Sequence, residues 1–288
     1  MAELLYGKPA ADALTAETRQ RADMLREKDV LPRLVILRCS ENEADGAYIR
    51  GAMKRGGLCG VDVELRTLAE NVSADELARA LEAVNSDNGI HGCLLLRPLP
   101  GHLKAMESKL CALLDPKKDV DGMTPVSAAG VFTGSGQGFP PCTAQACMAL
   151  LDYYHIDSAG KSAAVVGRSA VVGRPAAMLL LARNATVTVC HTGTKDVAAV
   201  TREADIIITA AGAAGSLTAA HVRPGQVVVD VSTNWNGVSL CGDAVSDDVS
   251  QIVEAITPVP GGVGAVTSAV LMAHTVRAAE YMTGEGGL

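Results

Sequence analysis

The 288-residue chain has few aromatic residues, no excess of positive charge and no long apolar run. Aromatic residues make up 3% of it, too few for a surface that stacks nucleic-acid bases. Lys and Arg number 25 against 32 Asp and Glu, and a net charge of −7 without a basic run disfavours nucleic-acid binding. No apolar run approaches the about 20 residues that cross a bilayer, and the N-terminus lacks the apolar core of a signal peptide. We therefore expect a cytoplasmic protein that binds neither nucleic acids nor membranes.

The eight cysteines form no C-x-x-C pair, and several lie inside apolar, strand-like runs. We expect reduced, mostly buried side chains. The six histidines and eight cysteines show no metal-ligand spacing, so no metal is expected. Cys142, in Pro141-Cys142-Thr143, is interpreted as packing at a hinge rather than as a nucleophile, because no base can be named as its partner.

Apolar runs of strand length alternate with helical patterns along most of the chain. The N-terminus reads as a strand and then a polar helix. Further strands are expected at 33–39, 61–68, 92–96, 163–166, 186–190, 205–210 and 226–231, and helices at 44–57, 74–85 (N-cap Ser73), 105–114, 144–154, 174–183 and 266–282. This alternation predicts an α/β fold with a parallel sheet covered on both faces. Residues 124–143, rich in Gly, Ser and Pro, are the predicted crossing between two domains.

A glycine-bounded turn lies between the strand at 163–166 and the helix at 174–183. Gly167 permits a sharp turn and Gly173 a close approach of helix to sheet, which leaves helix N–H groups open to phosphate oxygens. The spacing is G-x-S-x-x-x-G and meets the dinucleotide fingerprint G-x-G-x-x-G only in part. On these residues alone, a βα turn without a ligand remains an alternative.

The end of the next strand indicates which dinucleotide would bind. An NAD-selective site usually has Asp or Glu there for the ribose hydroxyls, but His191-Thr192-Gly193-Thr194 contains no acid. Arg168, Arg174 and the two threonine hydroxyls suit a 2′-phosphate instead. These residues favour NADP over NAD.

Four sequence blocks occur in one order: D-P-K-K-D-V-D-G at 115–122, P-C-T at 141–143, V-G-R-S at 166–169 and T-P-V-P-G-G-V-G at 257–264. With them, nearly the whole chain resembles the methylenetetrahydrofolate dehydrogenase/methenyltetrahydrofolate cyclohydrolase family. The resemblance implies a folate-binding, catalytic lobe (1–143 and 266–288, the last helix returning to it) and a Rossmann-like NADP lobe (144–265). Family members oxidise 5,10-methylenetetrahydrofolate to the 5,10-methenyl form and hydrolyse that to 10-formyltetrahydrofolate. They are commonly homodimers and need no metal.

The resemblance also assigns roles to single residues. Asp121 would accept two hydrogen bonds from the N–H edge of the pterin ring, as a carboxylate can. Tyr48 would line the folate channel, and Thr233 matches a backbone contact near the nicotinamide, although Ser232 replaces the usual glycine. The substrate-binding set is Tyr48, Asp121, Pro260, Gly261 and Gly262, and the cofactor-binding set is Gly167, Arg168, Ser169, Gly173, Thr192 and Thr233.

The chain departs from the family pattern at the catalytic position. The pattern Y-[VI]-x-x-K-x-K carries the catalytic lysine four residues after the tyrosine, where this chain has Ala52. Lys54 matches the second, non-catalytic lysine, and two helical positions rotate a side chain by about 200°, away from Ala52. The lysine's glutamine partner in V-Q-L-P-L-P is replaced by Leu96, and Asp45-Gly46 replaces the usual Ser-Gln.

These departures predict an NADP-dependent methylenetetrahydrofolate dehydrogenase whose cyclohydrolase step is severely impaired. Hydrolysis needs proton transfers that Ala52 and Leu96 cannot provide, whereas hydride transfer needs mainly orientation. Two alternatives remain: the full bifunctional enzyme with a relocated base (Arg50, Lys54 or Arg97), and a catalytically silent paralogue that binds folate or dinucleotide.

Overall fold

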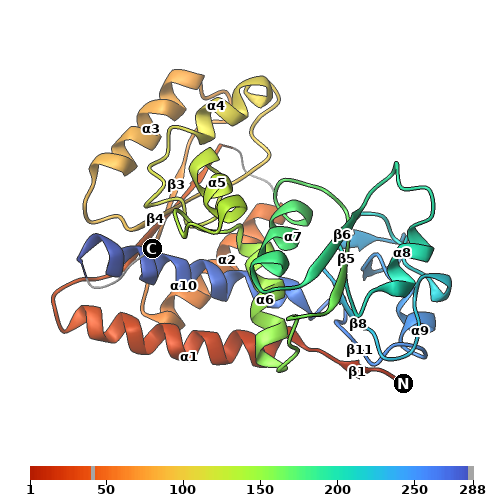
Figure 1. The fold of residues 1–288 in the computed structure, drawn as a ribbon. Helices are drawn as coiled ribbons and strands as arrows, with labels where there is room; N and C mark the ends of the chain where they lie inside the picture. The colour runs from red at the N-terminus through yellow and green to blue at the C-terminus, as the bar shows by residue number, and fades with distance from the viewer. Residues whose placement is uncertain (40–42, 285–288) are drawn as a thin grey trace. The chain divides into compact units, whose positions relative to one another are not determined.

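Figure 1 shows a computed structural model that describes residues 1–39 and 43–284. The chain divides into two compact units: unit 1 comprises Met1–Asp12 and Thr143–Thr267, and unit 2 comprises Ala13–Cys142 and the segment from Ser268 onward. The sequence analysis places residues 1–12 in the folate lobe, whereas in the structure they pack with unit 1. Strand β1 (Glu3–Leu4) pairs in parallel with β11 (Ala255–Ile256), and these backbone hydrogen bonds attach the N-terminus to unit 1.

Unit 2 is built on a three-stranded parallel sheet in the order β3-β2-β4. Its strands are β2 (Arg33–Arg38), β3 (Asp62–Thr67) and β4 (Gly92–Leu95), and its helices are α1 (Gly7–Arg26), α2 (Glu43–Cys59), α3 (Ala74–Ser86), η1 (Lys104–Met106), α4 (Glu107–Cys111), α5 (Pro125–Thr133) and α10 (Thr267–Met282). The four inner residues of β2 and all four of β4 are buried, as expected of strands covered on both faces.

Helix α3 shows how sequence fixes a helix and its packing. Ser73 and Glu76 form the capping box at its start, which confirms the predicted N-cap. Leu77, Leu81 and Val84, spaced at helical intervals, are buried in one core with residues of β2 and β4. The predicted range 74–85 is confirmed to within one residue.

Two long helices of unit 2 lie side by side in Figure 1, α1 in red and α10 in blue. Arg21 of α1 donates through Nε to Glu280 of α10 at 2.9 Å, and the pair is partly buried. The C-terminal helix is therefore an integral part of unit 2.

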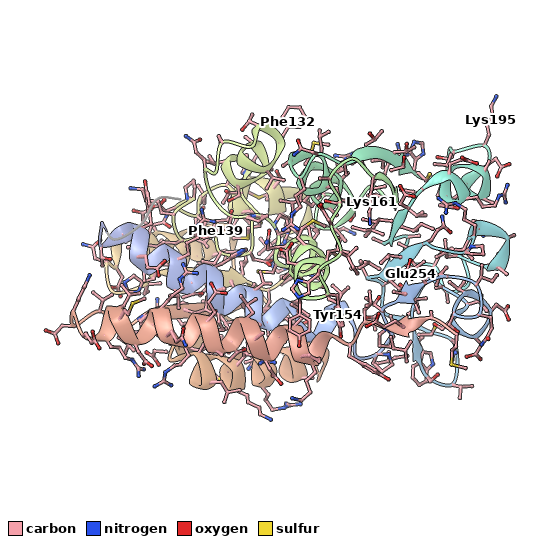
Figure 2. The ribbon with its side chains drawn as sticks, turned by 60° about the horizontal axis from the view of Figure 1, so that its bottom comes forward. Phe132, Phe139, Tyr154, Lys161, Lys195 and Glu254 are labelled. Atoms are coloured by element: carbon pink, nitrogen blue, oxygen red, sulfur yellow. The ribbon has the colours of Figure 1, made fainter. Side chains whose placement is uncertain are left out.

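Figure 2 separates the two phenylalanines of the chain: Phe139 lies inside the unit and is fully buried, whereas Phe132 on α5 projects outward and is 74% exposed.

Two predictions in unit 2 were wrong in detail. The crossing at 124–143 contains helix α5, which has Thr124 as N-cap, Pro125 in its first turn and Gly134 in the left-handed region after its end. Its Gly, Ser and Ala content masked these end signals. The helix predicted at 105–114 is a 3₁₀ turn followed by the five-residue helix α4.

Unit 1 contains a six-stranded parallel sheet in the order β1-β11-β8-β7-β5-β6. Its other elements are β5 (Ser162–Val166), β6 (Thr186–Cys190), β7 (Ile206–Thr209), β8 (Val227–Asp230), the antiparallel pair β9 (Asn234–Trp235) and β10 (Leu240–Cys241), α6 (Cys142–Tyr153), α7 (Gly173–Ala182), α8 (Val197–Glu203), η2 (Ala219–His221), α9 (Ser246–Val249) and η3 (Val263–Ala265). The predicted α/β class with a parallel, Rossmann-like sheet is confirmed.

The cysteine prediction is also confirmed. All eight cysteines are free thiols, and all but Cys241 are buried. Over residues 1–39 and 43–284, no helix combines the length and the apolar character that membrane crossing requires.

Candidate functional site

Helix α2 presents Tyr48 and Ala52 one turn apart, on the same face. Ala52 is fully buried, Tyr48 is 36% exposed, and Lys54 is exposed to solvent. The position of the family lysine thus faces the interior of unit 2, and its only side-chain atom is a methyl carbon. The prediction that Lys54 faces away from Ala52 is confirmed.

The segment after β4 brings a cation to the predicted pterin anchor. Leu96, at the glutamine position, is partly buried, and its N–H donates to the carbonyl of Leu37 at 2.9 Å. The next residue, Arg97, approaches Asp121 with its Nη2 3.6 Å from Oδ2. Both side chains are largely buried, 24% and 19% exposed. Sequence reasoning considered Arg97 only as a possible base and missed this pair.

Asp121 lies where burial strongly affects charge. Burial raises the pKa of its carboxyl, while Arg97 and hydrogen bonds from Cys142 act in the opposite direction. Burial, and then the nearby Cys142 and Asp121, raise the pKa of the Tyr48 phenol above its ordinary value. Tyr48, Arg97, Asp121 and Cys142 thus form one polar cluster in unit 2, which includes the two substrate-binding residues predicted for this unit.

Cys142 has a histidine neighbour that the sequence did not reveal. Its Sγ lies 3.8 Å from Nδ1 of His274 on α10 and donates to the carbonyl of Val120 at 3.3 Å. Burial raises the pKa of the thiol well above its ordinary value and lowers that of the imidazole to about 4. A thiol that keeps its proton is a poor nucleophile, and an imidazole with a pKa of about 4 is too weak a base to remove that proton, so the interpretation of Cys142 as a packing residue stands.

The other three predicted substrate-binding residues belong to unit 1. Pro260, Gly261 and Gly262 form a tight turn after β11, where Gly261 adopts φ +105° and its carbonyl accepts from the N–H of Gly7 at 2.8 Å. A Cβ on Gly262 would lie 2.5 Å from the Pro258 carbonyl oxygen. The glycines are therefore required by the turn itself, and their contact with a substrate stays a prediction.

The predicted phosphate-binding turn has the expected backbone. Gly167 follows β5 with φ +122°, and a Cβ there would lie 2.2 Å from the Ala210 carbonyl oxygen. A Cβ on Gly173 would lie 2.2 Å from the Gly167 oxygen. Ser169 accepts from the N–H groups of Val172 and Gly173 at 3.1 and 3.3 Å, which fixes the turn at the start of α7. No residue other than glycine fits at 167 or 173.

Side chains around this turn are open to solvent. Arg168, Ser169, Arg174 and Thr192 are all exposed. The turn after β6 is held by Thr194, whose Oγ1 accepts from the N–H of His191 at 3.0 Å, and it contains no carboxylate. Two guanidinium groups and exposed hydroxyls thus flank the carboxyl ends of β5 and β6, where ligands bind in open parallel sheets.

One buried carboxylate that sequence reasoning missed organises the loops after β7 and β8. Asp243 is fully buried and accepts five hydrogen bonds, at 2.7 to 3.0 Å, from Thr209 Oγ1, Ala211 N, Ala213 N, Ser232 Oγ and Asn234 Nδ2. Ser232, which replaces the family's usual glycine, also accepts from the N–H of Gly212 at 3.1 Å. The exposed Thr233 lies between two of these donors, so its backbone is held in place.

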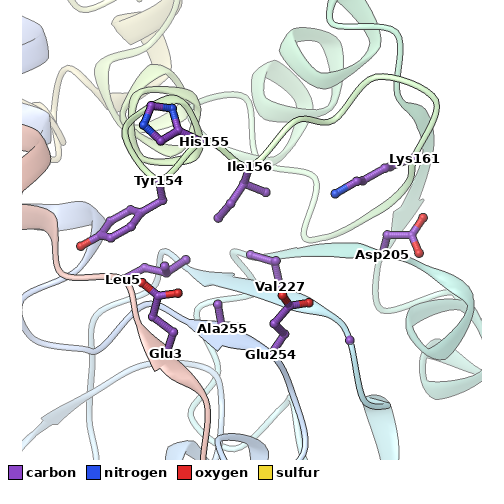
Figure 3. A pocket seen from close by; sticks show the side chains of 11 residues that line it. Glu3, Leu5, Tyr154, His155, Ile156, Lys161, Asp205, Val227, Glu254 and Ala255 are labelled. Atoms are coloured by element: carbon purple, nitrogen blue, oxygen red, sulfur yellow. The ribbon is translucent and has the colours of Figure 1, made fainter.

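Unit 1 also contains a polar cavity of about 320 Å³, shown in Figure 3. Its lining includes Glu3, Lys161, Asp205 and Glu254, which lie at the starts of β1, β5, β7 and β11. The phosphate-binding turn follows the end of β5, so the cavity lies at the other end of the sheet. It contains none of the predicted site residues.

Comparison with known proteins identifies the family. Residues 5–121 match the family model "Tetrahydrofolate dehydrogenase/cyclohydrolase, catalytic domain", and residues 141–283 match "Tetrahydrofolate dehydrogenase/cyclohydrolase, NAD(P)-binding domain". Together these matches span most of the chain. It belongs to the tetrahydrofolate dehydrogenase/cyclohydrolase family.

Similar proteins agree along the full length. The chain is 45% identical over 287 residues, 99% of each chain, to the "Bifunctional protein FolD" of Carboxydothermus hydrogenoformans. The crystal structure of the bifunctional FolD enzyme from Campylobacter jejuni superposes with a TM-score of 0.93 at 37% identity, covering 98% of this chain and 99% of that one. The Trypanosoma brucei dehydrogenase-cyclohydrolase, solved with NADP and an inhibitor, has a TM-score of 0.90 at 31% identity and 98% coverage of both chains.

The chain therefore has a catalytic domain and an NAD(P)-binding domain of this family. Among the residues that the structure describes, no group of three or more His, Cys, Asp or Glu could hold a metal ion.

Proposed function

We propose that this protein oxidises 5,10-methylenetetrahydrofolate to 5,10-methenyltetrahydrofolate with NADP and is a poor cyclohydrolase. One observation carries the proposal: the position of the catalytic lysine holds the fully buried methyl group of Ala52, and Leu96 takes the place of its glutamine partner. The phosphate-binding turn and Asp121 are retained. The replaced lysine and glutamine are the groups that would serve hydrolysis.

The two reactions differ in their need for an acid or base. Removal of a hydride from the one-carbon bridge leaves a delocalised cation, and no proton has to move. Hydrolysis adds water to that cation, removes a proton from the water and protonates a ring nitrogen. A positioned acid or base typically accelerates such steps by about 10²–10⁴-fold. Neither Ala52 nor Leu96 has a group that exchanges protons.

The cations considered as replacements do not suit the role. Arg97 lies beside Asp121, but a guanidinium stays protonated in proteins and is not a base near neutral pH. Lys54 and Arg50 are both exposed to solvent. The chemistry of Arg97 and the exposure of the other two argue against a relocated base.

The turn at Gly167–Gly173 suits a dinucleotide, because it joins the end of β5 to the start of α7, where free helix N–H groups can bind phosphate oxygens. Ser169 and the N–H groups at the start of α7 would hold the pyrophosphate, with Thr233 near the nicotinamide ring. Arg168, Arg174 and Thr192 would hold the 2′-phosphate, which an acid-free turn after β6 does not repel. The trypanosomal relative was solved with NADP, which supports this choice. NADP supplies the hydride acceptor when bound.

On the folate side, Asp121 would fix the pterin ring by accepting hydrogen bonds from its 2-amino group and N3–H. Tyr48 would line the channel that leads from the ring. Pro260, Gly261 and Gly262 would bring backbone close to the substrate. Orientation is the main requirement of hydride transfer, and these residues provide it without an acid or base.

One coupled assay tests the proposal. The protein is mixed with methylenetetrahydrofolate and NADP, and NADPH and methenyltetrahydrofolate are both followed by absorbance. We expect equal amounts of the two, with the methenyl compound decaying only at its rate in protein-free buffer at the same pH. Conversion to 10-formyltetrahydrofolate well above that rate would instead support the full bifunctional enzyme. The names of the relatives from Carboxydothermus hydrogenoformans and Campylobacter jejuni describe them as bifunctional.

The silent paralogue predicts a different outcome. It would be protected from heat by NADP yet form no NADPH. Retention of Asp121 and of the complete phosphate-binding turn argues against it.

A homodimer in the cytoplasm completes the proposal. The β9–β10 pair and its connection expose Trp235, Val238 and Leu240 at 64%, 85% and 47%, an apolar surface that a second copy would cover. Sedimentation equilibrium measures the mass of the assembly directly. A monomer at micromolar concentration would contradict this part of the proposal.

A further inference from the structure

Arg97 holds unused hydrogen-bond donors beside the predicted pterin anchor. Its guanidinium lies 3.6 Å from the Asp121 carboxylate, a charge contact longer than a hydrogen bond. Among the side chains that the structure describes, Arg97 has no hydrogen-bond partner and pairs with no other acid. The side chain is 24% exposed, so some of its five N–H donors remain accessible. Donor and acceptor thus stand next to each other, both held by unit 2.

The neighbouring groups match one edge of a pterin ring. A 2-amino-4-oxopteridine presents in sequence two donors, the 2-amino group and N3–H, and one acceptor, the C4 carbonyl oxygen. A carboxylate accepts from the two donors, and an adjacent guanidinium can donate to the carbonyl. Hydrogen bonds that involve a charged group are about twice as strong as those between neutral groups.

We propose that Arg97 is a specificity-determining residue that donates to the 4-oxo group of the pterin while Asp121 accepts from the N–H edge. The inference rests on the proposed function, since it uses the same folate site. It predicts that the site prefers a 4-oxo ring to a 4-amino ring. A 4-amino group is a donor that faces the donors of Arg97, and this mismatch lowers the affinity for the 4-amino ring. The family pattern has leucine at this position, so the discrimination belongs to this chain.

Folic acid and 4-amino-4-deoxyfolic acid differ in the substituent at ring position 4 and in the hydrogen on N3, and the effect of Arg97→Leu on each separates the contact at position 4 from the contact with Asp121. Binding of each is measured by calorimetry at pH 7.5 with saturating NADP, for the wild type, Arg97→Leu and Arg97→Lys. We expect Arg97→Leu to weaken folic acid by about 10–100-fold and the 4-amino analogue by less than threefold. Arg97→Lys retains a cationic donor and is expected to keep part of the preference. Circular dichroism and thermal melting verify that each variant is folded.

The outcomes separate the inference from the function on which it rests. Equal weakening of both ligands by Arg97→Leu would mean that Arg97 acts only through the charge of Asp121, and would overturn the inference. Unchanged affinity for folic acid would overturn it as well. If the wild type turns over methylenetetrahydrofolate while Arg97→Leu shows either result, the proposed function survives. If the wild type binds neither probe and forms no NADPH, the proposed function fails, and the inference with it.

Discussion

The two units differ in how closely the residues at their predicted ligand sites follow the family pattern. In unit 1 the turn at Gly167–Gly173 allows no side chain at either end, and five donors around Asp243 hold the adjacent loops. In unit 2 the anchor Asp121 is retained, but the residues around it have changed to Ala52, Leu96 and Arg97. Under the proposed function, the residues that both reactions need for binding are retained, whereas those that would move protons during hydrolysis are replaced.

The two units also differ in the groups that stabilise a buried carboxylate. Asp121 of unit 2 has a cation 3.6 Å away. Asp230 of unit 1 is 1% exposed, and its carboxylate accepts from the backbone N–H groups of Ser232, Asp243 and Ala244. Burial raises the pKa of Asp230 to about 6, and the nearby Asp243 adds to the rise. Each unit therefore compensates a buried negative charge in a different way.

The largest expected effect is a gain of cyclohydrolase activity on changing positions 52 and 96 of unit 2. The double variant Ala52→Lys/Leu96→Gln restores the amine and its amide partner, and we expect cyclohydrolase activity to rise by about 10²–10⁴-fold. The measurement is the decay of methenyltetrahydrofolate at constant pH. Ala52→Met/Leu96→Gln fills a similar volume without an amine and should gain nothing. A folded double variant without any gain would contradict the proposal that Ala52 and Leu96 limit hydrolysis.

The next effect concerns stability and pH in unit 1. Since the folded pKa of Asp230 is about 6 and its ordinary value is 3.8, the folded state binds this proton more tightly than the unfolded state. The contribution to stability is fully present below about pH 4 and is lost as pH rises through about 6, by about 3 kcal/mol. Asp230→Asn should remove this part of the decline. Melting temperatures from pH 4 to 7 measure it.

The control for Asp230→Asn is Asp247→Asn, which changes an exposed carboxylate of the same unit. Its pH profile should follow that of the wild type. Identical profiles for all three proteins would exclude Asp230 as the titrating group.

The third effect tests the turn that unit 1 retains. Gly167→Ala forces a Cβ to within 2.2 Å of the Ala210 oxygen at a φ of +122°. Strain of this kind costs about 1–3 kcal/mol, so NADP affinity should fall by up to about 10²-fold while folic acid binding to unit 2 persists. Calorimetry with each ligand measures both. Gly57→Ala, where a Cβ meets no atom within 4 Å, should leave NADP affinity unchanged.

Much of the fold could be predicted because local signals were strong. The strand at Thr186–Cys190 and the helix after Ser73 were found from periodicity and capping. Helix α5 was missed because its composition resembles a linker. The β9–β10 pair was missed because each strand has two residues, too few for an alternating pattern.

The sequence by itself determined the family, the glycine-bounded turn after β5 and the alanine at position 52, because each depends on residue types at fixed short spacings. Only the tertiary structure brought Arg97 to Asp121, His274 to Cys142 and five donors to Asp243. These contacts join segments between 9 and 132 residues apart, and sequence spacing carries no information about distances that the packed sheets and helices set.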